Sequence, residues 1–504
     1  MKKTAFLIML VTILSKIIGF VRDITLSYFY GASTVSDVFL ISQQIPNTLF
    51  SLIGTAVMMG FIPIASRLYE SRPKEEADRF TNAMLTAVVL IACAVIAFGL
   101  VFTRPIISLF AIGFTEEALD LAVSFTRILI WGLLANAVLF VLRGFLQVKE
   151  RYVITTMLGF PYNLVLITGI ALSATIDIRI LPVAGLLALF AQLLLFIPDL
   201  IKLDFTIRPT LDFDKALLKD FIRFVLPVVI ASGVTQLAMI VDRTLASSVG
   251  VGGISALQYA NRLNGFVLGL FITSLITVLY PMMARMAASG DTEKLKESVN
   301  ESVVLISLFV IPISIGAILL AGPIVDLLFG RGAFDERALQ MTSTALIAYA
   351  LGMLPTGLRE VFSKAFYAIE ESRIPMRNSM ITAVIQIGLS FLLYRPLGLM
   401  GIPLAASIAS AVSVLLYGAA LRNTVGYRPD RAHLVTLLKL LTASAAMGIA
   451  VVFLYRSLVP VVSPLFSLAL TVLPAMLLYA VCLYVLRVKE IQWILQKVKK
   501  RIRS

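Results

Sequence analysis

Apolar segments long enough to cross a lipid bilayer recur along the whole chain and limit its fold more than any other feature. A membrane-spanning helix needs about 20 predominantly apolar residues. Only 14% of the 504 residues are charged, whereas soluble domains carry about 25%. The sequence therefore predicts an all-α polytopic membrane protein with fourteen transmembrane helices. The predicted spans are residues 5–30, 36–66, 80–102, 121–147, 153–174, 181–201, 219–249, 253–284, 297–320, 337–368, 376–395, 399–421, 434–455 and 463–486.

The basic residues are distributed unevenly between the two sets of connecting loops. Of the 43 Lys and Arg residues, 30 fall at the N-terminus, in the even-numbered loops and in the C-terminal tail, and only six fall in the odd-numbered loops. Basic loops stay on the cytoplasmic side, so we expect both termini to be cytoplasmic. The first span lacks a small-residue cleavage site before Tyr30, so we expect it to be retained and not cleaved as a signal peptide.

The chain repeats itself at a spacing of about 218 residues. The motif at 61–67 returns at 279–285, with Pro63 matched by Pro281, and the match continues to residues 149–151 and 371–373. Each copy holds six spans, an even number, so the copies enter the membrane in the same orientation. Parallel repeats of this kind place the substrate site between the two halves. We therefore expect two six-helix lobes around a central cavity, at 1–202 and 203–431, followed by two extra helices and a basic tail at 432–504.

The first span carries charges where a charge is expensive. Lys16, Arg22 and Asp23 lie in an otherwise apolar helix, and a charge at the bilayer centre costs about 2.5 to 3.5 kcal/mol on the insertion scale. Such a residue must face a polar cavity, a partner or a ligand. Two interpretations remain open for Arg22 and Asp23, since they can also lie near the end of the helix, extend to water and pair with nearby chain.

The eighth span carries a second polar stripe. Gln258, Arg262 and Gly265 follow one face of the expected helix, with Asn261 beside them. Other charges within spans, such as Asp242-Arg243, can neutralise a neighbour. Because the first and eighth spans belong to different halves, a cavity between the halves would be lined by Lys16, Arg22 and Arg262. Arginine suits the two-pronged recognition of phosphate, so the pattern predicts an anionic substrate.

Several function classes find no support in the sequence. We find no phosphate-binding Walker loop, metal-ligand spacing or nucleophile motif, so we expect a transporter that is not an enzyme and needs no cofactor or metal. Cys93 and Cys482 lie in apolar runs, and the single histidine, His433, lies at a loop-to-helix junction. The net charge of +14 does not indicate a nucleic-acid partner, because no aromatic residues alternate with the basic residues of the tail.

The residues of the first two spans resemble a known family. Residues 15–23, then 30–39, then Ile45-Pro46-Asn47, are similar to the start of the lipid II flippases of the MurJ (MviN) family in the MOP exporter superfamily. The similarity extends to residues 259–263 and to the final pair of spans. It implies two six-helix lobes around a cationic cavity, alternating access, and a groove formed by the last two helices for the polyprenyl tail of the lipid carrier.

The resemblance also implies roles for individual residues. Lys16, Arg22 and Arg262 match the family's cavity cations, with Lys16 where Arg is common, and Asp23 and Asp37 match its functional acids. We add Gln258 and Asn261 to the predicted substrate-binding set from the stripe they share with Arg262. The resemblance also implies a location in a bacterial plasma membrane. The expected partners are a lipid-linked anionic glycan and membrane lipids, and we expect the protein to act as a monomer.

Two positions depart from the family pattern. Members often carry an arginine in the second span shortly after Pro-Asn, and Phe50-Ser51 occupies that place here. Some members of the family that the sequence resembles bind sodium in the C-terminal lobe, through an acid in the seventh span and an Asn and an acid in the eleventh. Here the ion site would consist of Asp242 with only Gln386 and Ser390, so sodium coupling is doubtful and coupling to the membrane potential is the alternative.

Three other functions compete with the flipping of lipid II for cell-wall synthesis. The runner-up is a flippase for another polyprenyl-diphosphate glycan, of the O-antigen or capsule type, which would share nearly every feature. An exporter of drugs or organic cations would need acids in its cavity. A membrane scaffold that transports nothing would not need Lys16 at bilayer depth.

Overall fold

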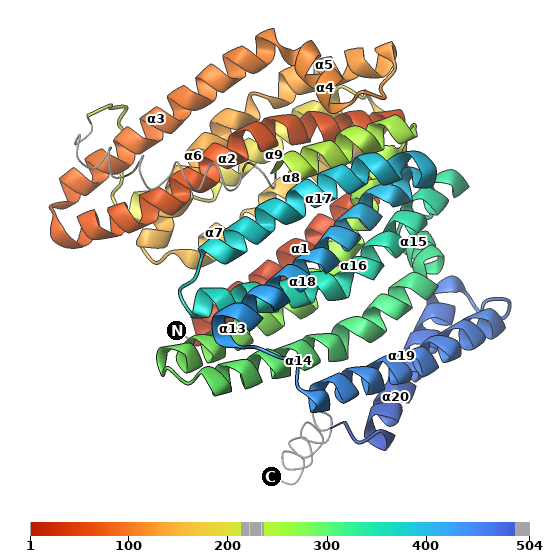
Figure 1. Ribbon diagram of the computed structural model, residues 1–504. Coiled ribbons are helices and arrows are strands. Elements are labelled where there is room, and N and C mark those ends of the chain that lie inside the picture. The colour runs from red at the N-terminus through yellow and green to blue at the C-terminus, as the bar shows by residue number, and fades with distance from the viewer. Residues whose placement is uncertain (1, 213–220, 222–232, 234–235, 489–504) are drawn as a thin grey trace. The chain divides into compact units, whose positions relative to one another are not determined.

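The computed structural model describes residues 2–212, 221, 233 and 236–488 (Figure 1). Every regular element in these residues is helical, as expected. The chain divides into two compact units. The first unit comprises Met1–Ser255 with Arg331–Asp335, and the second comprises Ala256–Gly330 with Glu336–Ser504.

The first unit is built from long helices joined by short connections, and residues 236–249 at its end are also helical. Polar caps begin several of them: Ser33 and Ser36 form a reciprocal capping box at the start of the second helix, and the Thr115 side chain accepts from Ala118 N at the start of the fifth. The helices are α1 (Lys2–Tyr30), α2 (Thr34–Ser71), α3 (Lys74–Val101), α4 (Thr103–Phe110), α5 (Glu116–Leu129), α6 (Gly132–Val148), α7 (Tyr152–Thr156), α8 (Gly159–Thr175), α9 (Ile180–Leu194) and α10 (Ile197–Lys202).

The second unit contains the C-terminal helices, and α12 begins at its boundary with the first unit. One π-helical turn, η1, lies inside the segment that α12 and α13 form, and a short 3-10 turn, η2, separates α17 from α18. The elements are α12 (Gly253–Val267), η1 (Leu268–Ile272), α13 (Thr273–Ala288), α14 (Thr292–Leu319), α15 (Ala321–Phe329), α16 (Glu336–Ala368), α17 (Arg373–Leu397), η2 (Gly398–Met400), α18 (Gly401–Val425), α19 (Arg431–Leu458) and α20 (Pro464–Val485).

Helix boundaries recur between the two halves of the sequence. Helix α14 begins 218 residues after α3, and α15 begins 218 residues after α4. Helix α16 begins 220 residues after α5. It is one continuous helix, whereas the corresponding part of the first copy is divided into α5 and α6. Helices α19 and α20 follow the end of the second copy.

The described residues contain nine helical segments long and apolar enough to cross a membrane, and ten if the bent pair α5 and α6 counts as one span. These two helices meet at 43°. The all-α polytopic prediction is confirmed. These segments are consistent with fourteen spans but do not confirm that number. The predicted span at 219–249 lies partly outside the described residues.

Each unit has its own packed interior. In the first unit, aromatic residues such as Phe61, Phe145 and Phe196 are fully buried where α2, α3 and α6 meet. In the second unit, the main cluster includes Phe366 and Tyr417 between α16 and α18. Smaller clusters attach α19 and α20 to the second unit, chiefly on α14 (Figure 1).

Among the residues that the structure describes, four helices end on a residue with left-handed backbone that is not glycine. Glu150, at φ 58°, follows α6, and Glu370, at φ 60°, follows α16. Both ends have the same hydrogen bonds. The N–H of Glu150 donates to the Gln147 carbonyl and the next N–H donates to the Leu146 carbonyl, and the end of α16 repeats this arrangement. This is the Schellman motif, in which the left-handed position usually belongs to glycine. Asp204 and Arg487 hold the equivalent position after α10 and α20.

Candidate functional site

The charged cluster of the first unit is centred on Arg22 of α1. Its Nη2 lies 2.6 Å and its Nε 3.0 Å from Oδ1 of Asp23, and its Nη1 donates to Oδ1 of Asn163 on α8 at 3.2 Å. The guanidinium carbon lies 5.8 Å from the centroid of the Tyr162 ring. Arg22 is therefore held by a carboxylate, an amide and an aromatic face, and we call these four residues the Arg22 cluster.

The Arg22 cluster forms because α1 and α8 approach closely. A Cβ added to Gly159 would lie 1.9 Å from Oγ of Ser15, and one added to Gly19 would lie 3.6 Å from the Asn163 amide. Nδ2 of Asn163 donates to the Gly159 carbonyl at 2.7 Å, which leaves its Oδ1 toward Arg22. From α2, Nε2 of Gln43 donates to the Tyr162 hydroxyl at 2.7 Å. The network thus joins α1, α2 and α8.

The charges of the cluster largely balance. The side chain of Arg22 is 16% exposed and that of Asp23 is 5% exposed. Arg22 is therefore a paired cation, and pairing with nearby chain was one of the two interpretations that the sequence left open. An adjacent carboxylate lowers the free-energy cost of holding arginine among apolar helices. Lys16, the other basic residue predicted in this helix, is exposed on the surface of α1.

Asp37 lies at the start of α2 and is 2% exposed. Its carboxylate accepts from the Gly252 N–H at 2.8 Å, and from the Ser255 N–H and hydroxyl at 2.7 Å each. Gly252 and Ser255 belong to the turn that begins α12, so Asp37 places a carboxylate at a helix N-terminus, where the unpaired N–H groups and the helix dipole favour negative charge. The contact holds α2 to residues more than two hundred positions away. Its predicted role in gating stays a prediction.

The polar stripe predicted around Arg262 lies on α12. Arg262 and Gln258 are half-buried, and Asn261 and Gly265 are exposed. A Cβ added to Gly265 would have open space around it. Helix α12 continues directly into the π-helical turn η1, a local widening that is frequent at functional sites. The stripe therefore ends beside an irregular turn in the helix, a feature that the sequence pattern did not predict.

The three residues of the predicted ion site fall in different parts of the chain. Asp242 is half-buried in the first unit, whereas Gln386 is half-buried and Ser390 fully buried on α17 of the second. Within the described part of the chain, no group of three His, Cys, Asp or Glu side chains is placed to hold a metal ion. The expectation against sodium coupling stays a prediction.

Sequence reasoning missed Tyr162 and Asn163. A signal was available, since Asn163 is the single amide side chain of the predicted span at 153–174 and a polar group inside a span usually has a partner. No sequence pattern indicated that this partner would be Arg22.

The fold is that of MOP superfamily transporters. A solved structure titled "Lipid II flippase MurJ, inward closed conformation" matches 95% of this chain and 98% of its own, with a TM-score of 0.81 at 24% identity. An inward-facing multidrug-resistance MATE transporter of the MOP superfamily matches 84% of this chain and 98% of its own, with a TM-score of 0.70 at 18% identity. These two likenesses define the class by its fold, which is that of these polytopic transporters.

The sequence comparisons identify the family within that class. The family model for lipid II flippase MurJ matches residues 26–473. The probable lipid II flippase MurJ of Thermotoga maritima is 27% identical over 96% of this chain and 97% of its own length. That of Aquifex aeolicus is 29% identical over 90% of this chain and 89% of its own. The chain belongs to the lipid II flippase MurJ family.

Proposed function

We propose that this membrane protein flips lipid II, the polyprenyl-diphosphate-linked precursor of peptidoglycan, from the inner to the outer leaflet. The observation that carries the proposal is the family match over residues 26–473, which includes all of the second lobe and residues 26–202 of the first. Full-length similarity to proteins named as probable lipid II flippases supports it. The protein is accordingly a transporter, and its substrate is a lipid that carries negative charge.

Within this function, Arg22 is proposed as one contact of the substrate diphosphate. A guanidinium has five N–H donors in a planar fork, and the bonds to Asp23 and Asn163 use three of them. These bonds fix the plane of the fork, so less conformational entropy is lost when a phosphate oxygen binds to the remaining donors. Asp23 and Asn163 thereby act as positioning residues.

The remaining predicted site residues complete the proposal. Arg262 with Asn261 and Gln258 supplies contacts from the second half, Lys16 adds a further positive charge, and Asp37 holds α2 while the transporter alternates between states. We propose that both termini are cytoplasmic, because basic loops are retained on that side, and that the protein acts as a monomer.

Helices α19 and α20 are proposed to accommodate the polyprenyl tail. They lie beyond the end of the repeat, and α20 exposes an apolar surface that includes Phe466, Leu473 and Leu477. An exposed apolar surface of this kind suits a hydrocarbon chain.

The function is tested by complementing a bacterial strain depleted of its own lipid II flippase, with lipid II on the outer leaflet as the readout. The wild-type chain should restore growth. Losing a charged hydrogen bond costs about 1.5 to 3 kcal/mol, so Arg22→Ala should weaken substrate binding roughly tenfold to a hundredfold. Arg22→Lys should recover only part, since lysine keeps the charge without the fork.

A double variant separates substrate binding from structure. Arg22→Ala leaves the buried Asp23 without its cation, whereas Arg22→Ala with Asp23→Ala removes both charges. If Arg22 serves only to neutralise Asp23, the double variant should flip normally. The proposal expects the double variant to express and fold well and still fail to flip lipid II. Arg395→Ala, an exposed change in α17, is the matched control and should behave as wild type.

A further inference from the structure

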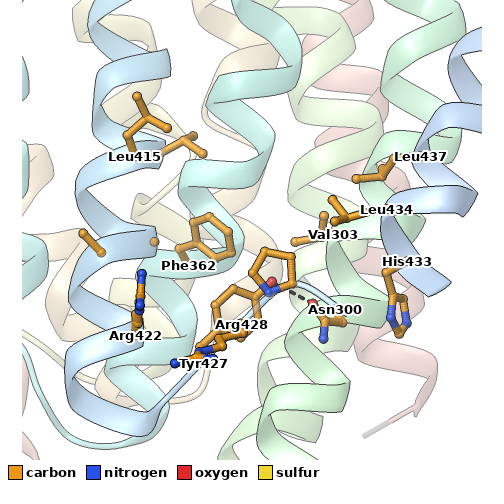
Figure 2. A pocket seen from close by; sticks show the side chains of 14 residues that line it. Asn300, Val303, Phe362, Leu415, Arg422, Tyr427, Arg428, His433, Leu434 and Leu437 are labelled. Carbon is orange, nitrogen blue, oxygen red and sulfur yellow. Dashed lines mark hydrogen bonds between the residues drawn. The ribbon is translucent and has the colours of Figure 1, made fainter. Parts of the chain in front are cut away.

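A pocket of about 630 Å³ lies within the second unit, where the end of α18 meets the start of α19 (Figure 2). Helices α14 and α16 form its other walls. Its volume falls in the range of small-molecule sites, about 300 to 1,000 Å³. The function proposed above does not use it.

One end of the pocket is basic. Arg422 near the end of α18 and Arg428 in the following loop contribute guanidinium groups, and His433 lies on the first turn of α19. Both arginines are exposed, and among the residues that the structure describes neither guanidinium is ion-paired with a carboxylate. Asp430, the nearest acid in sequence, accepts from the Ala432 N–H to cap α19 and lies 3.5 Å from Nδ1 of His433. The basic end therefore keeps a net positive charge.

The loop that carries Arg428 is held in place by its neighbour. Tyr427 is buried, and its hydroxyl donates to Oδ1 of Asn300 on α14 at 2.7 Å. Burial raises the pKa of Tyr427 to about 12, so the phenol stays neutral and adds no negative charge beside the arginines. The hydrogen bond from the neutral Tyr427 phenol to Asn300 therefore holds the loop beside the two arginines without adding a negative charge.

The opposite end of the pocket is apolar. Leu415 on α18 and Leu437 on α19 lie away from the arginines in Figure 2, with Val303 and Phe362 between. A Cβ added to Gly418 would meet nothing within 4 Å, so the wall of α18 is open at that point. Leu415 is 72% exposed. The lining therefore changes from cationic to apolar over the last turns of α18 and the first turns of α19.

We infer that this pocket binds an anionic phospholipid of the surrounding membrane, with the headgroup phosphate on Arg422 and Arg428 and an acyl chain along Gly418 and Leu415. Basic pockets between the ends of membrane helices suit phospholipid headgroups, and Arg422 and Arg428 belong to a loop predicted to be cytoplasmic. The chain's own C-terminal tail is a poor occupant, since residues 497–503 carry five positive charges and no negative one. This site is independent of lipid II transport.

Native mass spectrometry of the full-length protein in detergent tests the inference. Phosphatidylglycerol and phosphatidylcholine with identical chains are added in equal amounts, and phosphatidylglycerol should be retained preferentially. Arg422→Gln with Arg428→Gln should lower that retention by roughly thirtyfold, from about 1 kcal/mol for each basic residue near an anionic surface. Arg373→Gln with Arg377→Gln is the matched control, because it makes the same charge change on exposed α17 residues outside the pocket. The control should change retention by less than about twofold, an effect below 0.5 kcal/mol.

Two further arms separate a lipid from a free anion. Gly418→Leu fills the open space without changing charge, so it should weaken phosphatidylglycerol binding, whereas a site for phosphate alone would be indifferent to it. Millimolar inorganic phosphate should not displace the lipid. Equal retention of both lipids, an unaffected arginine double variant, an unaffected Gly418→Leu variant or displacement by phosphate would each overturn the inference. None of these outcomes bears on flipping, which complementation measures separately.

Discussion

Asp37 shows how a charge inside a membrane protein can serve the fold. Its carboxylate accepts three hydrogen bonds from Gly252 and Ser255 while almost fully buried. Each buried donor that loses its acceptor costs about 1 to 3 kcal/mol. The residue is thus tied to the start of α12 by several bonds, none of which requires a ligand.

We predict that Asp37→Ala destabilises the purified protein by about 2 to 4 kcal/mol, because it leaves these buried donors without an acceptor. Asp37→Asn, which retains one acceptor oxygen, should cost less. Thermal unfolding in detergent measures both. If Asp37→Ala melts like wild type and yet abolishes flipping, the carboxylate acts in gating and the structural account fails.

At this scale the sequence predicted which residues bear unusual charge but not what they touch. Arg22 and Asp23 are neighbours in the chain, so their pairing could be anticipated as one of two alternatives. Asn163 lies 141 positions from Arg22 and the partners of Asp37 lie more than 200 positions away. Such contacts depend on how helices pack, and no local pattern encodes them.

Among the elements, small residues decide how closely α8 packs on its neighbours. A Cβ at Gly169 of α8 would lie 2.0 Å from Cβ of Ala184 on α9. Glycine there lets two helix backbones approach each other, which drives association where lipid supplies no hydrophobic force. In contrast, a Cβ at Gly316 in the last turn of α14 would meet nothing within 4 Å.

These two glycines make a matched pair for mutation. We predict that Gly169→Ala destabilises the first unit by about 1 to 3 kcal/mol, because overpacking forces α8 and α9 apart. Gly316→Ala should leave stability unchanged or slightly raised, since alanine is the better helix former. Thermal unfolding of both variants in the same detergent gives the comparison, and equal melting temperatures would contradict it.

The elements were predictable to different degrees. The repeat predicted from Pro63 and Pro281, which lie inside α2 and α13, recurs in the boundaries of the helices that follow, α3 and α14. The short helices α4 and α15 were not predicted, since eight or nine residues are too few for a distinct periodic signal. The π-helical turn η1 was also not predicted, because a short apolar sequence does not distinguish a π-helix from an α-helix.

For the whole molecule, the distribution of charge predicts its orientation. With 30 basic residues in one set of loops and the tail, and six in the other set, the positive-inside rule places both termini in the cytoplasm. Orientation is a property of the complete chain, since each loop alone carries only a few charges.

Single cysteines in a variant without Cys93 and Cys482 test this orientation in intact cells. Thr175, exposed at the end of α8, and Ser289, exposed after α13, are suitable positions. An impermeant thiol reagent added outside should label Thr175→Cys and leave Ser289→Cys unlabelled until the membrane is permeabilised. The reverse result would invert the predicted topology.

The left-handed helix ends after α6 and α16 bear on how this protein can be handled outside the membrane. Glu150 and Glu370 adopt a backbone that costs a side-chain-bearing residue about 1 kcal/mol or more, which glycine avoids. Glu150→Gly with Glu370→Gly should therefore raise the melting temperature in detergent by a few degrees, whereas glycine at the mid-helix position Ala348 should lower it. A double variant that melts no higher than wild type would mean that the two glutamates are not strained. If the increase is found, two substitutions at the ends of corresponding helices extend the working life of the solubilised transporter, and with it the range of detergents in which its transport cycle can be measured.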